Sequence, residues 1–361
     1  MQGSKPVIVV EDDVWTRLIE VVLDPRTSPE RLAAFADFMS PDVPDFGAWC
    51  EHVRKKAAAI FPSDVNLVSA HELHANLAPA QALVTESLRV GADELALAPQ
   101  LKAVQKYGMI YRNIDVAACA ARGVKVLGVR RRANMSCAEH AFALMLALSR
   151  RMVDLAGLIS VDQLNKMGGE YKPFDDRHTP RANWGRFGGL RALNGATIGI
   201  IGLGEIGREI AVRAAAFGMR VLYHQRTPLT QAEEVQFAAS YRPLDGLLGE
   251  SDWVVPQLPL DASTRGILNR ERLAQMKRGA CIVNVSRAEL IDRGALLEGL
   301  RSGHIGGFAL DSQYEEPGGA DDELLSFDRV VLTPHMAGSP RFNGLKDIEE
   351  LIVGLAQALS R

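Results

Sequence analysis

The chain is poor in cysteine and aromatic residues and has no long uninterrupted apolar run. Its 361 residues include four cysteines, none of them in a CxxC pair: Cys50, Cys119, Cys137 and Cys281. This usage is typical of reduced thiols in a cytosolic protein. No apolar stretch reaches the roughly 20 residues that a bilayer span needs, and no signal-peptide pattern opens the chain. We therefore expect a cytoplasmic protein without membrane contact.

Positive and negative residues are nearly equal in number, with 41 Lys and Arg against 44 Asp and Glu, which gives a net charge of −3. No like-charge block is long enough to indicate a nucleic-acid partner. The segment His71-Glu72-Leu73-His74 resembles a metal motif, but its histidines are three apart, whereas the zinc helix motif needs four. We expect no metal site.

Apolar runs typical of buried strands alternate with helical segments along the whole chain. The first set comprises residues 6–11, 65–69, 82–85, 101–105 and 124–128. The second set comprises residues 197–201, 220–223, 253–258, 281–286, 307–311 and 329–333. This alternation predicts an α/β protein with two Rossmann-like or flavodoxin-like domains, each built on a parallel sheet. Ser28, followed by Pro29, is expected to cap an early helix, and 344–359 to form the last one.

Residues 196–227 have the pattern of a dinucleotide-binding unit: strand, glycine turn, helix, strand. The turn reads GLGEIG, with Gly202, Gly204 and Gly207 in the GxGxxG spacing. The first glycine permits the tight turn, the second lets the backbone approach a pyrophosphate, and the third lets helix and strand pack closely. The phosphates are expected at the N-terminus of the following helix, beside Glu205 and Ile206.

The end of the second strand of this unit distinguishes the two dinucleotides. An NAD site usually carries Asp or Glu there, which binds the ribose hydroxyls. This chain has Gln225, Arg226 and Thr227 instead. Gln225 removes a charge that would repel a 2′-phosphate, and Arg226 could pair with that phosphate or be a solvated loop residue. We expect NADP to be preferred over NAD.

Polar segments follow three of the later strands, at residues 284–287, 311–317 and 334–338. Ligands bind outside the carboxyl ends of parallel strands, so an Arg, an acid and a His are predicted to meet near the nicotinamide. The Arg would hold the carboxylate of a 2-keto acid, and the His would give a proton to the developing alkoxide. A neighbouring carboxylate would orient the ring. Taken singly, Arg287 could equally form a salt bridge, Glu316 could be a solvated turn acid, and His335 could cap the C-terminal helix.

Five motifs together resemble the D-isomer-specific 2-hydroxyacid dehydrogenases over about Leu101 to Ser360: GLGEIG, LPLDASTRGILN, MKRGACIVNVSRAELID, GFALDSQYEEP and TPHMAG. The resemblance implies that the catalytic residues are Arg287, Glu316 and His335. It also implies cofactor contacts around Pro259, Thr264 and Val285, with the nicotinamide carboxamide near Asp311.

The architecture of that family implies a substrate-binding domain of residues 1–128 with 337–361, a nucleotide-binding domain of 129–336, and a cleft between them. An apolar helix is predicted at 135–152, capped by Ser136 with Glu139 in a capping box. It matches the family's interdomain and dimerisation segment, so a homodimer is expected. Residues 157–191 lack periodicity and are expected to form a functional loop or an oligomer arm.

The segment that corresponds to the family's substrate-facing loop departs from the family pattern. Members commonly have G-x-G-x-D-N-I-D, whereas residues 108–115 read GMIYRNID, with Ile110 in place of Gly and Arg112 in place of Asp. The predicted substrate-binding residues are Gly108, Met109, Arg112 and Arg287. Arg112 either recognises a second anionic group or forms an interdomain salt bridge.

The function that these features favour is NADP-preferring reduction of a small 2-keto acid such as glyoxylate or hydroxypyruvate. One alternative is an NAD-linked dehydrogenase of a larger, more anionic 2-hydroxyacid. Another is a dinucleotide-sensing or non-redox protein on the same scaffold.

Overall fold

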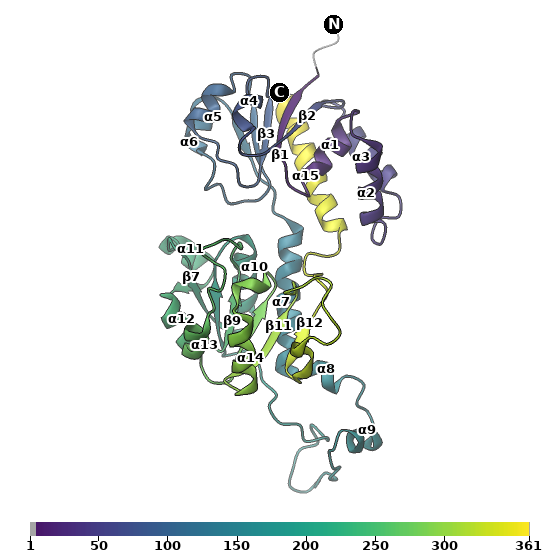
Figure 1. Ribbon diagram of the computed structural model, residues 1–361, viewed down its shortest axis with the longest axis vertical. Coiled ribbons are helices and arrows are strands. Elements are labelled where there is room, and N and C mark those ends of the chain that lie inside the picture. The colour runs from purple at the N-terminus through teal and green to yellow at the C-terminus, as the bar shows by residue number, and fades with distance from the viewer. Residues whose placement is uncertain (1–4, 361) are drawn as a thin grey trace. The chain divides into compact units, whose positions relative to one another are not determined.

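Two all-parallel sheets organise the chain in the computed structural model, which describes residues 5–360 (Figure 1). The first belongs to a unit made of the chain up to Ser136 together with the residues from Gly338 onward. The second belongs to a unit of Cys137–Ala337. The predicted α/β class with parallel sheets is confirmed.

The sheet of the first unit has five strands in the order β2-β1-β3-β4-β5, which is the flavodoxin-like order. Its strands are β1 (Val7–Glu11), β2 (Asp64–Val68), β3 (Ala82–Thr85), β4 (Ala103–Lys106) and β5 (Lys125–Leu127). In the centre of this sheet Val9 pairs with Asn66 on one side and Leu83 on the other. All five strands fall on the apolar runs of the first set.

The helices of this unit cover both faces of the sheet. They are α1 (Arg17–Leu23), α2 (Pro29–Met39), α3 (Phe46–Lys56), α4 (Leu73–Asn76), α5 (Ala92–Leu97), α6 (Val116–Ala121) and α15 (Phe342–Leu359). The C-terminal helix α15 packs against α1, α3 and β4, and Leu345, Ile348 and Leu351 join the core there (Figure 1). The last helix therefore completes the domain in which the chain begins.

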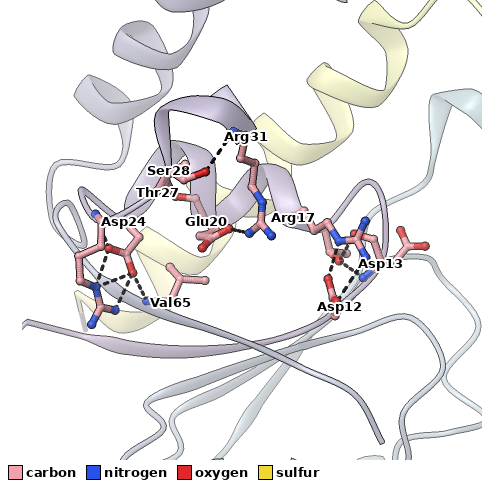
Figure 2. Close-up of polar contacts among 11 residues, drawn as sticks. Asp12, Asp13, Arg17, Glu20, Asp24, Thr27, Ser28, Arg31 and Val65 are labelled. Atoms are coloured by element: carbon pink, nitrogen blue, oxygen red, sulfur yellow. Dashed lines mark hydrogen bonds and ion pairs between the residues drawn. The ribbon is translucent and has the colours of Figure 1, made fainter. Parts of the chain in front are cut away.

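Polar contacts fix the early helices (Figure 2). Ser28 caps α2 as predicted, because its Oγ accepts the backbone N–H of Arg31 at 3.2 Å. Helix α1, which the sequence analysis did not predict, ends at the buried carboxylate of Asp24. Asp24 accepts hydrogen bonds from Arg26 and from the backbone of Val65 at the start of β2. The end of α1 is thereby tied to the sheet.

The sheet of the second unit has seven strands in the order β12-β11-β10-β9-β6-β7-β8. They are β6 (Thr197–Ile201), β7 (Arg220–His224), β8 (Ala239–Tyr241), β9 (Trp253–Pro256), β10 (Ala280–Asn284), β11 (Ile305–Leu310) and β12 (Val330–Leu332). The strand order reverses between β6 and β9, and such a switch point is where ligands bind in open α/β sheets. Six of these strands were predicted. The three-residue β8 was missed because it has no apolar run.

Ten helical segments accompany this sheet, and the first of them begins in the preceding unit. They are α7 (Arg132–Arg150), α8 (Met152–Leu155), α9 (Val161–Lys166), α10 (Glu205–Ala216), α11 (Gln231–Gln236), α12 (Leu244–Glu250), α13 (Arg270–Gln275), η1 (Ala288–Leu290), α14 (Arg293–Arg301) and η2 (Glu323–Ser326). No helix of residues 5–360 is both long and apolar enough to cross a bilayer.

The apolar helix predicted at 135–152 is α7, but its predicted cap is wrong. The helix begins at Arg132, so Ser136 lies inside it and accepts a hydrogen bond from Asn343 at 2.8 Å. Six apolar residues of α7 join the core of the second unit together with strand residues such as Ile198 and Ile200: Ala138, Ala141, Phe142, Leu144, Met145 and Leu148. The helix is therefore buried against the sheet of the second unit.

The segment 157–191 is mostly exposed and largely without regular structure, as its composition predicts. It also contains the short helix α9, which the sequence analysis missed. Ser160 and Gln163 form a reciprocal capping box at its start, which explains why six residues can hold a helical turn there.

Candidate active site

The glycine turn after β6 has the backbone geometry that the GxGxxG spacing predicts. Gly202 has φ +100°, and a Cβ added there would lie 2.4 Å from the carbonyl oxygen of Gln257. A Cβ on Gly207 would lie 2.3 Å from the carbonyl oxygen of Gly202. The structural tasks predicted for these two glycines, a tight turn and close packing, are therefore confirmed.

Gly204 differs from its neighbours, because a Cβ added there would meet no atom within 4 Å. This glycine is the N-cap of α10, whose first residues are Glu205 and Ile206. The open space thus lies at the positive end of a twelve-residue helix. These features fit the pyrophosphate of a dinucleotide.

The residues after β7 carry no acid. Gln225 donates its amide to the carbonyl oxygen of Thr227 at 2.6 Å, which closes a short turn. Arg226 is exposed, and it has no ion-pair partner among residues 5–360. The guanidinium is therefore available to an anionic ligand.

Three further residues expected near the cofactor lie after β9 and β10. Pro259 and Thr264 belong to one turn, which is closed by a 2.6 Å hydrogen bond from Thr264 Oγ1 to the carbonyl oxygen of Pro259. Val285 follows β10 and is buried.

Arg287 is presented by a turn that Asn284 builds. The buried amide of Asn284 donates to the carbonyl oxygen of Arg287 at 2.8 Å and accepts the backbone N–H of Ser286 at 2.9 Å. The Arg287 side chain is exposed, and its Nη1 donates to the carbonyl oxygen of Ser286 at 2.8 Å. An Arg on so rigid a turn can hold a carboxylate.

Glu316 and His335 form a direct pair. His335 Nδ1 lies 2.9 Å from Glu316 Oε2, while Glu316 Oε1 accepts the backbone N–H of Gln313 at 2.8 Å. The hydrogen bond from His335 holds the pKa of Glu316 below its ordinary value. The carboxylate is thus ionised near neutral pH and orients the imidazole ring.

Asp311 anchors the segment that carries His335. It follows β11, is 1 % exposed, and accepts the Thr333 hydroxyl at 2.6 Å and the backbone N–H groups of Met336 at 2.9 Å and Ala337 at 2.8 Å. Burial alone would raise the pKa of Asp311, but hydrogen bonds from His140, Thr333 and the two backbone groups lower it to about 2. The anchored His335 has φ +52°, a left-handed conformation that is rare outside glycine.

The three predicted catalytic residues therefore follow adjacent parallel strands. The loop after β11 joins the turn after β10 through Ser312 Oγ, which donates to the carbonyl oxygen of Ser286 at 2.7 Å. It joins the loop after β12 through the His335 N–H, which donates to the Asp311 carbonyl oxygen at 2.9 Å. One sheet edge thus carries Arg287, Glu316 and His335.

The residues predicted to bind substrate from residues 108–115 belong to the first unit. Gly108 has φ +145°, and its carbonyl oxygen accepts the backbone N–H of Val129 at 3.1 Å. Asn113 secures the other end of the segment by donating to the carbonyl oxygen of Leu88 at 2.7 Å. Met109 and Arg112 are exposed. The segment 71–74, which resembles a metal motif, also belongs to this unit. There His74 Nε2 lies 3.1 Å from Glu94 Oε1.

Sequence reasoning missed two residues of the anchor, His140 and Thr333. His140 Nε2 lies 3.0 Å from Thr333 Oγ1 and 3.4 Å from Asp311 Oδ1. The one feature that could have indicated it is a histidine within the apolar run of α7.

The chain is similar to known proteins in sequence and in fold. Residues 142–337 match the family model of the D-isomer specific 2-hydroxyacid dehydrogenase, NAD binding domain. The chain is 40% identical over 272 residues to a glyoxylate reductase of Pyrococcus furiosus, covering 75% of this chain and 76% of that protein. It is 37% identical over 290 residues to a glyoxylate reductase of Thermococcus onnurineus, covering 80% and 82%. The crystal structure of a glyoxylate reductase from Paecilomyes thermophila matches with a TM-score of 0.56 at 25% identity, covering 99% of this chain and 96% of that one.

Proposed function

The chain belongs to the D-isomer specific 2-hydroxyacid dehydrogenase family of NAD-dependent oxidoreductases, and we propose that it reduces a small 2-keto acid of the glyoxylate type. The observation that carries the proposal is the Glu316–His335 pair at the sheet edge that also bears Arg287. The names of the relatives at 37–40% identity support glyoxylate as the substrate.

In this proposal each residue of the trio has one task. Arg287 binds the carboxylate of the keto acid and polarises the adjacent carbonyl. A nicotinamide dinucleotide held by the glycine turn would supply the hydride for the carbonyl carbon. Protonated His335, whose Nδ1 is held by Glu316, gives the proton on Nε2 to the carbonyl oxygen as that oxygen becomes an alkoxide. In the reverse direction neutral His335 accepts the hydroxyl proton, and the Glu316 carboxylate stabilises the resulting imidazolium.

NADPH is the proposed preferred cofactor. The support is the unpaired Arg226 beside Gln225, at a position where an acid would bind the ribose of NADH. The pyrophosphate would lie on Gly202, Gly204 and Gly207 with the amides of Glu205 and Ile206, and Thr227 would flank the ribose. Pro259, Thr264, Val285 and Asp311 are proposed to line the rest of the dinucleotide site.

The unit that contains residues 108–115 is the proposed substrate-binding domain, paired with a nucleotide-binding domain of about 129–336. Gly108 and Met109 would hold the substrate carboxylate through their backbone. Arg112, exposed and without an ion-pair partner among residues 5–360, would meet a second anionic group of a larger substrate.

A homodimer is also proposed, with residues 157–191 as an arm. The support is the number of apolar side chains that α8, α9 and their surroundings expose: Met152, Val153, Ile159, Val161 and Met167. The molar mass in solution, measured by light scattering, tests this directly, and a monomer would refute it.

The experiment that tests the function is a panel of 2-keto acids, including glyoxylate and hydroxypyruvate, with NADPH and NADH. Glyoxylate-dependent loss of nicotinamide absorbance, abolished by His335→Ala, is the expected result. Turnover confined to larger anionic acids with NADH would favour the alternative that Arg112 supports. Tight cofactor binding without turnover of any acid would refute the reductase and favour a sensing role.

A further inference from the structure

His140, on helix α7, contacts the anchor of His335. Its side chain is 16% exposed, on the face of α7 that packs into the second unit. Its Nε2 lies 3.0 Å from Thr333 Oγ1 and 3.4 Å from Asp311 Oδ1. Within residues 5–360, the hydrogen-bond and ion-pair partners of His140 are Thr333 and Asp311, and neither Glu316 nor the His335 ring is among them.

The chemistry of the threonine hydroxyl determines the direction of these hydrogen bonds. Thr333 has one O–H, and it donates that proton to Asp311 Oδ1 at 2.6 Å because an ionised carboxylate only accepts. The Thr333 oxygen must then be an acceptor toward His140, so Nε2 of His140 carries a proton. A directed chain results, from His140 N–H to Thr333 O–H to the Asp311 carboxylate.

The Asp311 carboxylate in turn holds both ends of the segment around His335. Thr333 precedes His335, and the two backbone N–H donors, Met336 and Ala337, follow it. His335 has a left-handed backbone conformation, with φ +52°. This conformation is unfavourable for a residue with a side chain, so contacts with the surrounding structure must hold it in place. The hydrogen bond from His140 orients the Thr333 hydroxyl toward Asp311 and therefore helps to hold the His335 backbone in this conformation.

We propose that His140 is a positioning residue for His335, acting through Thr333 and Asp311. This inference rests on the proposed role of His335 as the acid of the reduction. When His140 loses its N–H donor, the Thr333 hydroxyl is free to rotate, one hold on the Asp311 carboxylate weakens, and the His335 segment samples other conformations. Proton transfer then slows, while binding of cofactor and acid, for which no contact with His140 is proposed, persists.

Two matched pairs of variants test the proposal in the full-length protein. His140→Leu removes the donor, whereas His140→Gln keeps an N–H donor on a side chain of similar reach. Thr333→Val removes the hydroxyl at nearly constant volume, whereas Thr333→Ser keeps it. Glu139→Gln, on the exposed neighbouring residue of α7, controls for changes to the helix itself.

The kinetic readout separates positioning from a merely structural role. In His140→Leu and Thr333→Val, kcat is expected to fall roughly 10- to 100-fold, the scale of a misplaced catalytic group. The KM for the keto acid and the Kd for NADPH should change little. The solvent isotope effect on kcat should rise, because proton donation becomes the slower step. His140→Gln and Thr333→Ser are expected to recover most of the rate.

A second readout needs no turnover and therefore tests the anchor even if the proposed function fails. The backbone amides of Met336 and Ala337 should exchange with deuterium faster in His140→Leu and Thr333→Val than in the wild type. Exchange in β6 and β7 should not change. If His140→Leu does not fold, the Thr333 pair decides alone. The proposal would be overturned if amide exchange and kcat were both unchanged in His140→Leu and Thr333→Val. It would also be overturned if His140→Gln and Thr333→Ser were as impaired as these two variants.

Discussion

Asp311→Asn is the substitution that tests the anchor most severely, because it replaces a buried carboxylate by a nearly isosteric amide. The carboxylate accepts from Thr333, Met336 and Ala337. An asparagine offers one carbonyl oxygen to these three donors and turns an NH2 group toward at least one of them. A buried donor left without an acceptor costs on the order of 1–3 kcal/mol.

The pKa of Asp311 gives an independent magnitude. It is lowered from 3.8 to about 2, and the side chain is 1% exposed, so solvent screening is small. A difference of this size corresponds to about 2 kcal/mol of stability at neutral pH. Because the pKa is lower in the folded protein, this contribution is present above about pH 4. It disappears as the pH falls toward 2.

Hydrogen exchange in rising urea concentrations measures this loss within the second unit alone, on peptides from β10 and β11. Asp311→Asn should destabilise these peptides by about 2 kcal/mol at pH 7, and the difference from wild type should be roughly half as large at pH 3. Glu316 and other acids titrate in both proteins, so their effect cancels in the difference. A difference that is absent at pH 7, or equally large at pH 3, would refute the account of the anchor.

Three further substitutions test the rest of the site. Arg226→Ala should raise the Kd for NADPH roughly 10- to 100-fold in fluorescence titrations, because a charge-assisted hydrogen bond to the 2′-phosphate is lost. The Kd for NADH should not change. Equal effects on both cofactors would contradict the phosphate assignment. His335→Ala should lower kcat about 10²- to 10⁴-fold in steady-state assays, with NADPH still bound; retained turnover would remove His335 from the mechanism. Gly202→Ala should weaken binding of both dinucleotides and lower the thermal midpoint, because its Cβ would lie 2.4 Å from the Gln257 carbonyl oxygen at φ +100°; normal affinity and midpoint would show that this turn can adapt.

Local sequence patterns were sufficient for most of the fold. Strands β1 to β5 are short apolar runs bounded by polar or turn residues, and these runs are visible without any tertiary information. Two of the segments that were missed, α1 and β8, have residue patterns that do not specify their secondary structure. Leu18, Ile19, Val21, Val22 and Leu23 of α1 form a nearly continuous apolar run, which suits a buried strand as well as a buried helix.

The start of α7 shows that a local motif can also predict a helix boundary wrongly. Ser136 and Glu139 have the spacing of a capping box, yet the helix begins four residues earlier at Arg132. The Arg132 backbone donates to the buried carboxylate of Asp347 at 2.9 Å, and its guanidinium pairs with the same residue at 2.8 Å. An acid 215 positions away therefore sets where the helix starts, which no local pattern can specify.

The candidate site divides in the same way. The sequence by itself determined the glycine turn, the missing acid after β7, and the residue types at three strand ends. Each of these features lies within a few residues of a strand that the sequence predicts, so neighbouring residues are enough to identify it. Only the tertiary structure decided that Glu316 lies 2.9 Å from His335, and that Asp311 points at the amides of Met336 and Ala337. It also brought His140 to Thr333 across 193 positions of the chain. The reason is that a hydrogen bond depends on a separation of about 3 Å and on orientation, and packing of the whole unit determines both.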